Sequence, residues 1–308
     1  MQLDGIHHIT AITGDAPGNV EFYVGTLGLR LVKKSVNQDD PTVYHLFYGD
    51  EEGHPGADLT FFEYPGVAPG RAGDGMVHRI AWRVGSEDAL DFWQARLIDA
   101  GTGPERHDGS LHFTDPEGLA HELQAYEGDE EPLAARAPDI PGEHALLGFA
   151  GVRAYSSEPA RSEGLLAEGM GFEATGDGAW RVAGPSRSSF YVYDAPPVEP
   201  GRSGGGTVHH VAFATEPEEH EDWRPRVAGA GARPTTVIDR FYFRSIYFRE
   251  PSGVLFELAT KGPGFAVDEP AESLGERLSL PPDYEPLREE LERKLTPLPD
   301  PRSRAAAG

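Results

Sequence analysis

Two pairs of adjacent histidines stand about two hundred positions apart in this 308-residue chain. The first pair, His7 and His8, lies in the apolar stretch GIHHITAIT, and the second pair, His209 and His210, lies in TVHHVAFAT. Because the chain has no cysteine, nitrogen and oxygen atoms must supply the protein ligands of any bound metal ion. Two imidazoles and one carboxylate form a ligand set that suits non-haem Fe(II). The two pairs therefore indicate a metal site.

The chain contains four copies of one sequence pattern, which we call modules one to four. Modules two and four match best: FTDPEGLAHELQ at 113–124 corresponds to FREPSGVLFELA at 248–259. Their upstream flanks, MVHRIAWRV and TVHHVAFAT, correspond as well. Each module reads as a strand, a helix and several strands, with Ser86 as the helix N-cap and Gly101 as the helix stop in module two. The pattern predicts an α+β protein rich in sheet. Weaker copies at 5–65 and 147–195 are modules one and three.

The modules divide the chain into two predicted domains. Residues 1–127 hold modules one and two, and residues 147–262 hold modules three and four. The acidic, proline-bearing stretch 128–146 between them is a predicted linker. Residues 263–308 form a C-terminal tail, in which EPLREELERKL at 285–295 predicts one helix.

Strand alternation predicts which member of each histidine pair faces a site, because residues i and i+2 share one face. In module two, alternate residues from His78 to Val84 form an apolar, buried face. The same phase in modules one and four turns His8, Thr10 and His210 toward the concave face. It places the first histidine of each pair on the packed face. The second histidine of each pair is therefore the better ligand candidate.

A glutamate supplies the third ligand candidate. Glu257 lies between Phe256 and Leu258 on the last strand of module four, where a carboxylate needs a partner that offsets its desolvation. We use the word cup for the concave face on which such candidates meet. In the equivalent cup of modules two and three only one of the three candidates is retained, Glu122, because Arg79 and Gly151 occupy the positions of His8 and His210. One cup is therefore expected to hold metal and the other is not.

These motifs resemble the vicinal oxygen chelate superfamily, which includes glyoxalases and extradiol dioxygenases. Within it, the chain is similar to ring-cleaving dioxygenases that act on hydroquinones, over nearly its whole length, including LRLVKKSVNQDDPTVYHLFYGDEEGHPG at 29–56. The resemblance implies four βαβββ modules in two curved-sheet domains, with module one beside module four. It implies His8, His210 and Glu257 as ligands of Fe(II), with Mn(II) as the alternative metal.

The resemblance also implies a set of residues around the substrate: Arg240, Tyr247, His7, His209 and Thr10. Alternation supports Tyr247, which shares parity with Glu257. For His7 and His209 the phase points away from the cup, so they are expected to orient neighbouring groups. The other histidines that we considered are read as structural, and the aromatic residues of the last module as core or pocket wall. These residues are His45, His54, His78 and His121, and Phe241, Tyr242, Phe243 and Phe248.

The predicted function is therefore an Fe(II)-dependent dioxygenase that opens a hydroquinone-type ring with O₂. Three alternatives remain open: a catechol extradiol dioxygenase, a glyoxalase-like lyase or isomerase, and a metal-free protein that binds an aromatic ligand. The glyoxalase-like enzyme would use a non-redox divalent ion, normally with a fourth protein oxygen ligand.

The charge of the chain indicates which partners are excluded and which environment is favoured. The net charge is −24, from 51 acidic and 27 basic residues, and only four residues are lysines. Such a surface repels nucleic acid and anionic membranes. Abundant acidic residues and scarce lysine favour a halophilic protein, because salt would screen the repulsion among the acidic side chains. The chain shows no secretion signal and no membrane-length apolar run, so a cytoplasmic location is expected. A homo-oligomer is compatible with all these features.

Overall fold

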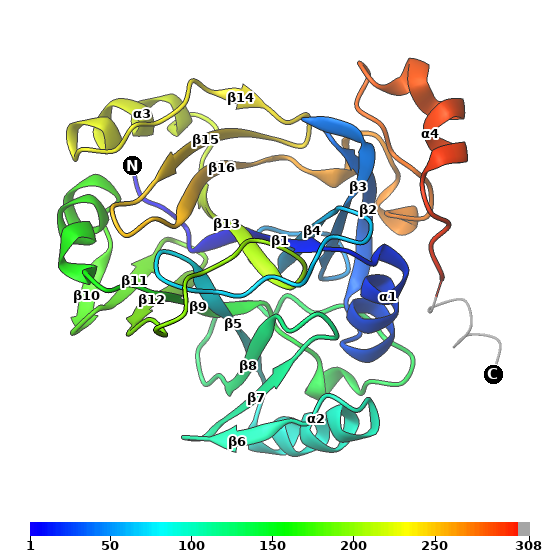
Figure 1. The fold of residues 1–308 in the computed structure, drawn as a ribbon, viewed down its shortest axis with the longest axis horizontal. Coiled ribbons are helices and arrows are strands. Elements are labelled where there is room, and N and C mark those ends of the chain that lie inside the picture. Colours follow the sequence, from blue (N-terminus) through cyan, green and yellow to red (C-terminus); the bar gives the residue numbers. More distant parts are fainter. Residues whose placement is uncertain (301–308) are drawn as a thin grey trace.

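The computed structural model describes residues 1–300 and contains two curved, eight-stranded sheets, in agreement with the predicted α+β fold. In sheet one the metal-ligand candidates lie on the three adjacent strands β16, β13 and β1 (Figure 1). The strand order of sheet one is β14 (Ile238–Asp239), β15 (Phe243–Arg249), β16 (Leu255–Pro263), β13 (Thr207–Thr215), β1 (Ile6–Thr13), β4 (Asp58–Glu63), β3 (Asp40–Gly49) and β2 (Arg30–Asn37).

Sheet two has the same architecture and comes from the middle of the chain. Its strand order is β10 (Glu173–Gly176), β11 (Ala179–Ala183), β12 (Ser188–Asp194), β9 (Phe149–Tyr155), β5 (Val77–Val84), β8 (Ala120–Ala125), β7 (Ser110–Thr114) and β6 (Glu105–His107). Modules one and four thus form sheet one, as the resemblance implies, and modules two and three form sheet two. The division of the chain into domains at 128–146 stays a prediction.

Few helices accompany the sheets. The predicted caps of module two are confirmed: the Ser86 side chain accepts a hydrogen bond from Ala89 N, and Gly101 adopts φ 76° just after the helix. The tail helix is also confirmed, as a short 3₁₀ turn followed by α4. The α-helices are α1 (Ala16–Val20), α2 (Glu87–Asp99), α3 (His220–Gly229) and α4 (Arg288–Lys294). Two π-helical turns cover Glu21–Thr26 and Leu165–Gly169, and 3₁₀ turns cover Gly142–His144, Pro159–Ser162, Phe265–Val267, Ala271–Ser273 and Glu285–Leu287.

β-Bulges interrupt the pairing of β1 with β13. Ile6 pairs with Phe213 and His8 with Ala212, so His7 is the extra residue on β1. Thr10 pairs with His210 and Ala11 with Val208, so His209 is the extra residue on β13. The first histidine of each pair therefore occupies a bulge, which locally breaks the alternation of side chains. Sheet two repeats this arrangement, with His78 and Ala150 in the equivalent positions.

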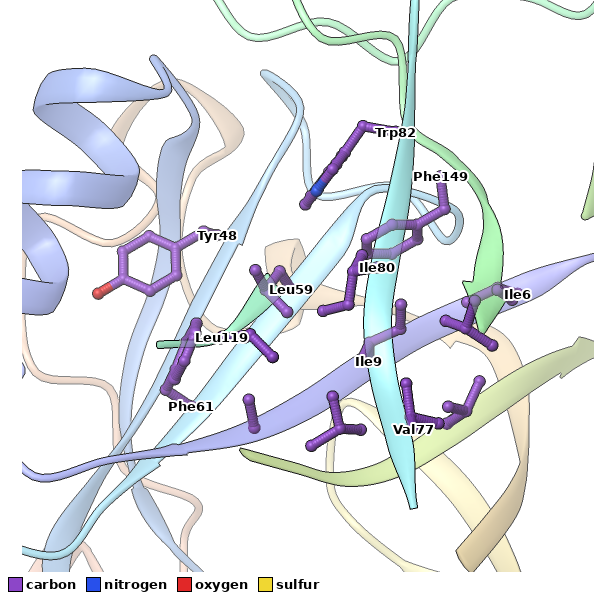
Figure 2. Close-up of a cluster of buried hydrophobic side chains, with 14 of the residues drawn as sticks. Ile6, Ile9, Tyr48, Leu59, Phe61, Val77, Ile80, Trp82, Leu119 and Phe149 are labelled. Atoms are coloured by element: carbon purple, nitrogen blue, oxygen red, sulfur yellow. The ribbon is translucent and has the colours of Figure 1, made fainter. Parts of the chain in front are cut away.

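One contiguous apolar core contains side chains from both sheets. Figure 2 shows its centre, where Ile6 and Ile9 of β1 approach Val77 and Ile80 of β5. A second, smaller cluster, which includes Phe47, Tyr242, Phe243 and Phe265, lies apart from this core. Burial of these side chains on the outer strands of sheet one fixes the wall of the pocket described below.

The segment after β16 packs back onto sheet one. Lys33 of β2 is fully buried, and its Nζ lies 2.7 Å from Asp268 Oδ1 and also pairs with Glu269. Ser279 N donates to Lys34 O at 2.8 Å, which extends the contact along β2.

Within residues 1–300, no helix is long and apolar enough to cross a membrane.

Candidate metal centre and pocket

Three side chains from three neighbouring strands meet at one point in sheet one. His8 Nε2 lies 3.2 Å from His210 Nε2, and the two nitrogens lie 3.2 and 3.0 Å from Glu257 Oε2. All three side chains are buried. Across residues 1–300 this is the one group of three such side chains close enough to hold a metal ion, and it is the set that the sequence and the resemblance predicted.

The hydrogen bonds of His7 assign the proton of His8. Thr260 O can only accept, so His7 Nε2, 3.1 Å away, carries a hydrogen and His7 Nδ1 is an acceptor. His8 Nδ1 lies 3.0 Å from His7 Nδ1 and must therefore donate, which leaves the lone pair of His8 Nε2 free. Burial lowers the pKa of His7 to about 3, which keeps this ring neutral. His7 thus orients His8 with its ligating nitrogen toward the cluster.

His209 stands in the same relation to His210, with their Nδ1 atoms 2.8 Å apart. The prediction that His209 lies on the packed face is wrong: its side chain is exposed and contacts Phe62 edge-on. His7 is buried, but beside His8 and Phe243 instead of the main core. The bulges cause both deviations, because they turn two consecutive side chains off the core.

The arrangement of the three candidates demands positive charge. Neither oxygen of Glu257 accepts a hydrogen bond of normal geometry from the described residues, although both oxygens are buried. Burial opposes ionisation of Glu257, but attraction to His8 and His210 outweighs burial and holds its pKa well below the usual range. An ionised, buried carboxylate beside two imidazole nitrogens fits a divalent cation.

A threonine occupies the position where a fourth ligand would lie. Thr10 pairs with Thr60 in module one as Ala212 pairs with Glu257 in module four, so Thr60 is the symmetry equivalent of Glu257. Thr60 Oγ1 lies 2.8 Å from Thr10 Oγ1, which lies 2.9 Å from His210 Nε2. A neutral hydroxyl that already has partners is a poor ligand, so a metal bound here would have three protein ligands and open positions.

A pocket adjoins the centre. Its lining includes His8 and His210, but Glu257 lies beneath the surface and Thr10, His7 and His209 are not part of the wall. The remaining wall combines aromatic rings with polar side chains, mostly from β2, β3, β4 and β15 and from two turns: Ser35, Val36, Asn37, Gln38, Asp39, His45, Phe47, Phe62, Arg240, Tyr242, Phe243 and Tyr247. Tyr242 and Phe243 are thus pocket wall, as predicted, whereas Phe248 belongs to the core.

Arg240 and Tyr247 lie together on one side of the pocket. Tyr247 pairs directly with Glu257 across β15 and β16, so the parity argument is confirmed. Arg240 Nε lies 3.4 Å from the Tyr247 hydroxyl, and its two terminal nitrogens lie 3.2 and 3.1 Å from the carboxylate of Asp39. Burial, with Glu257 nearby, raises the pKa of Tyr247, so its hydroxyl remains protonated at neutral pH. This side of the pocket therefore offers a cation and a hydroxyl donor.

Sequence reasoning missed the opposite flank of the pocket, built by β4, β3 and β2. The sequence predicts His45 to be a structural strand residue and gives no signal for Thr60 or Ser35, whereas His45 and Ser35 line the pocket and Thr60 contacts His45. The alternation of β3 carries the signal, because His45 and Phe47 share one face while Tyr44, Leu46 and Tyr48 pack into the main core. Only the strand order of sheet one shows that this face looks into the pocket.

The equivalent cup of sheet two is filled. Arg79 Nη1 lies 3.6 Å from Glu122 Oε2, so an arginine stands where sheet one has His8. A Cβ atom on Gly151, the equivalent of His210, would lie 2.4 Å from Phe190 O. No side chain fits at Gly151 without a backbone shift, and the cup lacks both imidazoles, as predicted.

Comparisons with known proteins give the family and several relatives of the chain. Residues 5–123 match the model of the Glyoxalase/Bleomycin resistance protein/Dioxygenase superfamily. MhqA of Bacillus subtilis, provisionally named a ring-cleaving dioxygenase, is 38% identical over 97% of this chain and 100% of its own length. The chlorohydroquinone/hydroquinone 1,2-dioxygenase of Sphingobium indicum is 34% identical, with 96% of both chains covered.

Solved structures give the same result for the fold. A crystal structure from Bacillus subtilis, provisionally described as a dioxygenase, superimposes with a TM-score of 0.90 at 39% identity, over 97% of this chain and 98% of that one. Glyoxalase I from Zea mays has a TM-score of 0.58 at 16% identity, over 83% of this chain and 92% of that one, which supports the fold alone.

Proposed function

Because the chain belongs to the glyoxalase/bleomycin resistance protein/dioxygenase superfamily, we propose that it is a ring-cleaving dioxygenase of hydroquinone-type substrates that uses Fe(II) and O₂. The observation that carries the proposal is the convergence of His8, His210 and Glu257 beside a pocket walled by aromatic rings. Mn(II) is the alternative metal, since the same ligands suit both ions.

The three side chains would hold the metal through His8 Nε2, His210 Nε2 and a Glu257 oxygen. When bound, Fe(II) supplies open positions for a phenolate oxygen and O₂ and the redox chemistry that joins them. Thr60 in the fourth position favours this function over a glyoxalase-like one, because a metal with three protein ligands keeps more positions for substrates. His7 and His209 keep the ligand rings oriented through their Nδ1 contacts.

The rest of the pocket would bind and orient the ring. Phe47, Phe62 and Phe243 offer apolar contacts and exclude water from the site. Arg240 and Tyr247 would stabilise negative charge that develops on the substrate oxygen, because one is a fixed cation and the other a protonated hydroxyl beside it. These roles agree with the predicted set, and Thr10 would act as a hydrogen-bond partner next to His210.

Oxygen uptake after anaerobic loading with Fe(II) tests the proposal. We expect uptake with hydroquinone, slower uptake with catechol, and none after metal removal. Glu257→Gln should abolish uptake, whereas Glu122→Gln, the matched change in sheet two, should retain it. Full turnover in His8→Ala or His210→Ala, or the same turnover with and without metal, would refute the assignment.

A further inference from the structure

The pocket wall has one polar flank without a role in the proposed function. His45 of β3 and Ser35 of β2 are direct neighbours in the antiparallel pair, so their side chains share a face, and both line the pocket. Ser35 is buried, and its hydroxyl makes no hydrogen bond of normal geometry, although it lies near the hydroxyl of Tyr242. Buried polar groups normally have partners, so this flank suits a polar ligand atom.

The ring of His45 is held in a fixed orientation. Its Nε2 lies 3.0 Å from Thr60 Oγ1, and Phe47 and Phe62 pack against it at centroid distances of 3.9 and 4.4 Å. Thr60 is itself fixed by Thr10. Because Nε2 is engaged, Nδ1 is the ring nitrogen that remains available, and no hydrogen bond to Nδ1 occurs within residues 1–300.

The strand order sets His45 apart from the metal centre. β4 lies next to β1, and β3 follows β4, so His45 is two strands away from His8. With neighbouring strands about 4.8 Å apart, this places the two histidines at different ends of a ligand that spans the pocket. The intervening β4 contributes Phe62, whose ring suits contact with an aromatic ring.

A hydroquinone has its two oxygens at opposite ends of the ring. If one oxygen is bound at the metal centre, the ring places the other oxygen on the far side of the pocket. This second oxygen then needs a hydrogen-bond partner there. Arg240 is a weaker candidate for this partner, because its guanidinium is already engaged by Asp39 and Tyr247. His45 Nδ1 has no such competitor.

We propose that His45, with Ser35 beside it, binds the substrate hydroxyl para to the metal-bound oxygen, and thereby selects para-diphenols over monophenols and catechols. The inference rests on the proposed function only for the position of the first oxygen. Thr60 acts as a positioning residue, because it holds His45 Nε2 and so directs Nδ1 into the pocket.

Affinity measurements without turnover test the subsite. Hydroquinone and phenol are titrated anaerobically into the Mn(II)-loaded protein. Phenol serves as the comparison because it lacks the para hydroxyl. We expect the wild type to bind hydroquinone roughly tenfold to a hundredfold more tightly than phenol. His45→Phe should bring this ratio close to one, mainly by weakening hydroquinone. His112→Phe, a matched change in sheet two, should keep the wild-type ratio.

Two further variants separate the ring nitrogens and protect the test against misfolding. His45→Asn carries a polar atom near the position of Nδ1 and should keep most of the ratio. His45→Gln extends toward Nε2 and should lose most of it. A wild-type ratio near one, an unchanged ratio in His45→Phe, or the reverse order of the Asn and Gln variants would overturn the subsite.

Failure of the subsite and failure of the proposed function give different results. If the ratio behaves as expected and no oxygen is consumed, the subsite stands and the dioxygenase assignment fails. If hydroquinone is cleaved and the ratio is unchanged in His45→Phe, the assignment stands and the subsite is wrong.

Discussion

His8 and His210 are separated by most of the chain, yet their Nε2 atoms lie 3.2 Å apart. Both nitrogens approach Glu257, and the hydrogen-bond pattern of His7 leaves the lone pair of His8 directed at the cluster. Acceptor atoms at this separation repel one another unless a cation or proton lies between them. A metal ion at the meeting point of β1, β13 and β16 would therefore offset the repulsion among these atoms.

Metal binding should consequently stabilise the fold. We expect Mn(II), added anaerobically to metal-free protein, to raise Tm, since saturation at a thousand times Kd contributes about 4 kcal/mol. Thermal scans with and without metal measure the shift. His210→Ala should abolish it, and Glu122→Gln should leave it intact. An equal shift in His210→Ala would place the metal elsewhere.

Asp115 predicts a pH dependence of stability away from the metal site. Burial raises its pKa to about 6, while Tyr23 donates to its Oδ2 at 2.8 Å. Between the ordinary value of 3.8 and about 6, the folded carboxyl is protonated and the unfolded one is ionised, so stability is lost as the pH rises through this window. Asp115→Asn removes this loss. Relative to wild type, its free energy of unfolding should increase by about 3 kcal/mol between pH 3.5 and 7.

Urea denaturation across that pH range measures the difference between the two proteins. The quantity compared is the slope of the free energy of unfolding with pH. A cost of the substitution that is the same at every pH does not change this slope. His121 contributes the opposite slope in both proteins, because burial lowers its pKa to about 3, and so cancels from the difference. A difference that does not change with pH would show that folding does not raise the pKa of Asp115.

The buried Lys33 should hold the C-terminal segment on sheet one. Lys33→Met leaves Glu269, which is 3% exposed, without its main partner, at an expected cost of about 3–5 kcal/mol. Urea denaturation measures this cost, and limited proteolysis should cut the segment after β16 faster. Lys34→Met is the matched control, because Lys34 bonds a backbone oxygen at the surface. The double variant Lys33→Met/Glu269→Gln should recover part of the loss; equal stability of both lysine variants would contradict the prediction.

The charge of −24 predicts a protein stabilised by salt. At 0.1 M ionic strength charges act over about 10 Å, and at 1 M over about 3 Å, so concentrated salt screens the repulsion among the acids. Tm should rise between 0.1 and 2 M KCl, by more than in sucrose of equal osmolality, which does not screen charge. A Tm that falls or stays constant in KCl would argue against a halophilic protein.

The sequence predicts the ligand set better than it predicts the surroundings of the ligands. His8, His210 and Glu257 could be identified because the modules align and because the other two modules lack the histidines. The placement of His209 was wrong because alternation assumes a regular strand. The spacing of the apolar residues held the missing clue: Ile6 and Ile9, like Val208 and Val211, enclose two residues that both leave the core.

The far side of the pocket could not be predicted in the same way. His45 and Thr60 acquire their positions from the order β1-β4-β3-β2, which depends on pairings between distant segments. Their residue types do not recur at the equivalent positions of the other modules, where Thr60 corresponds to Glu257. Their roles become visible only when the curvature of sheet one brings the strands around a common space.

The order of sheet one also constrains how the protein is made. β1 lies between β4 and β13, but β1 ends at Thr13 and β13 begins at Thr207, so the ribosome delivers one partner long before the other. At ordinary rates of translation the free edge of β1 waits on the order of ten seconds or more. Until β13 follows, the uncovered edge of β1 can pair with strands of other chains, and such pairing lowers the yield of folded protein.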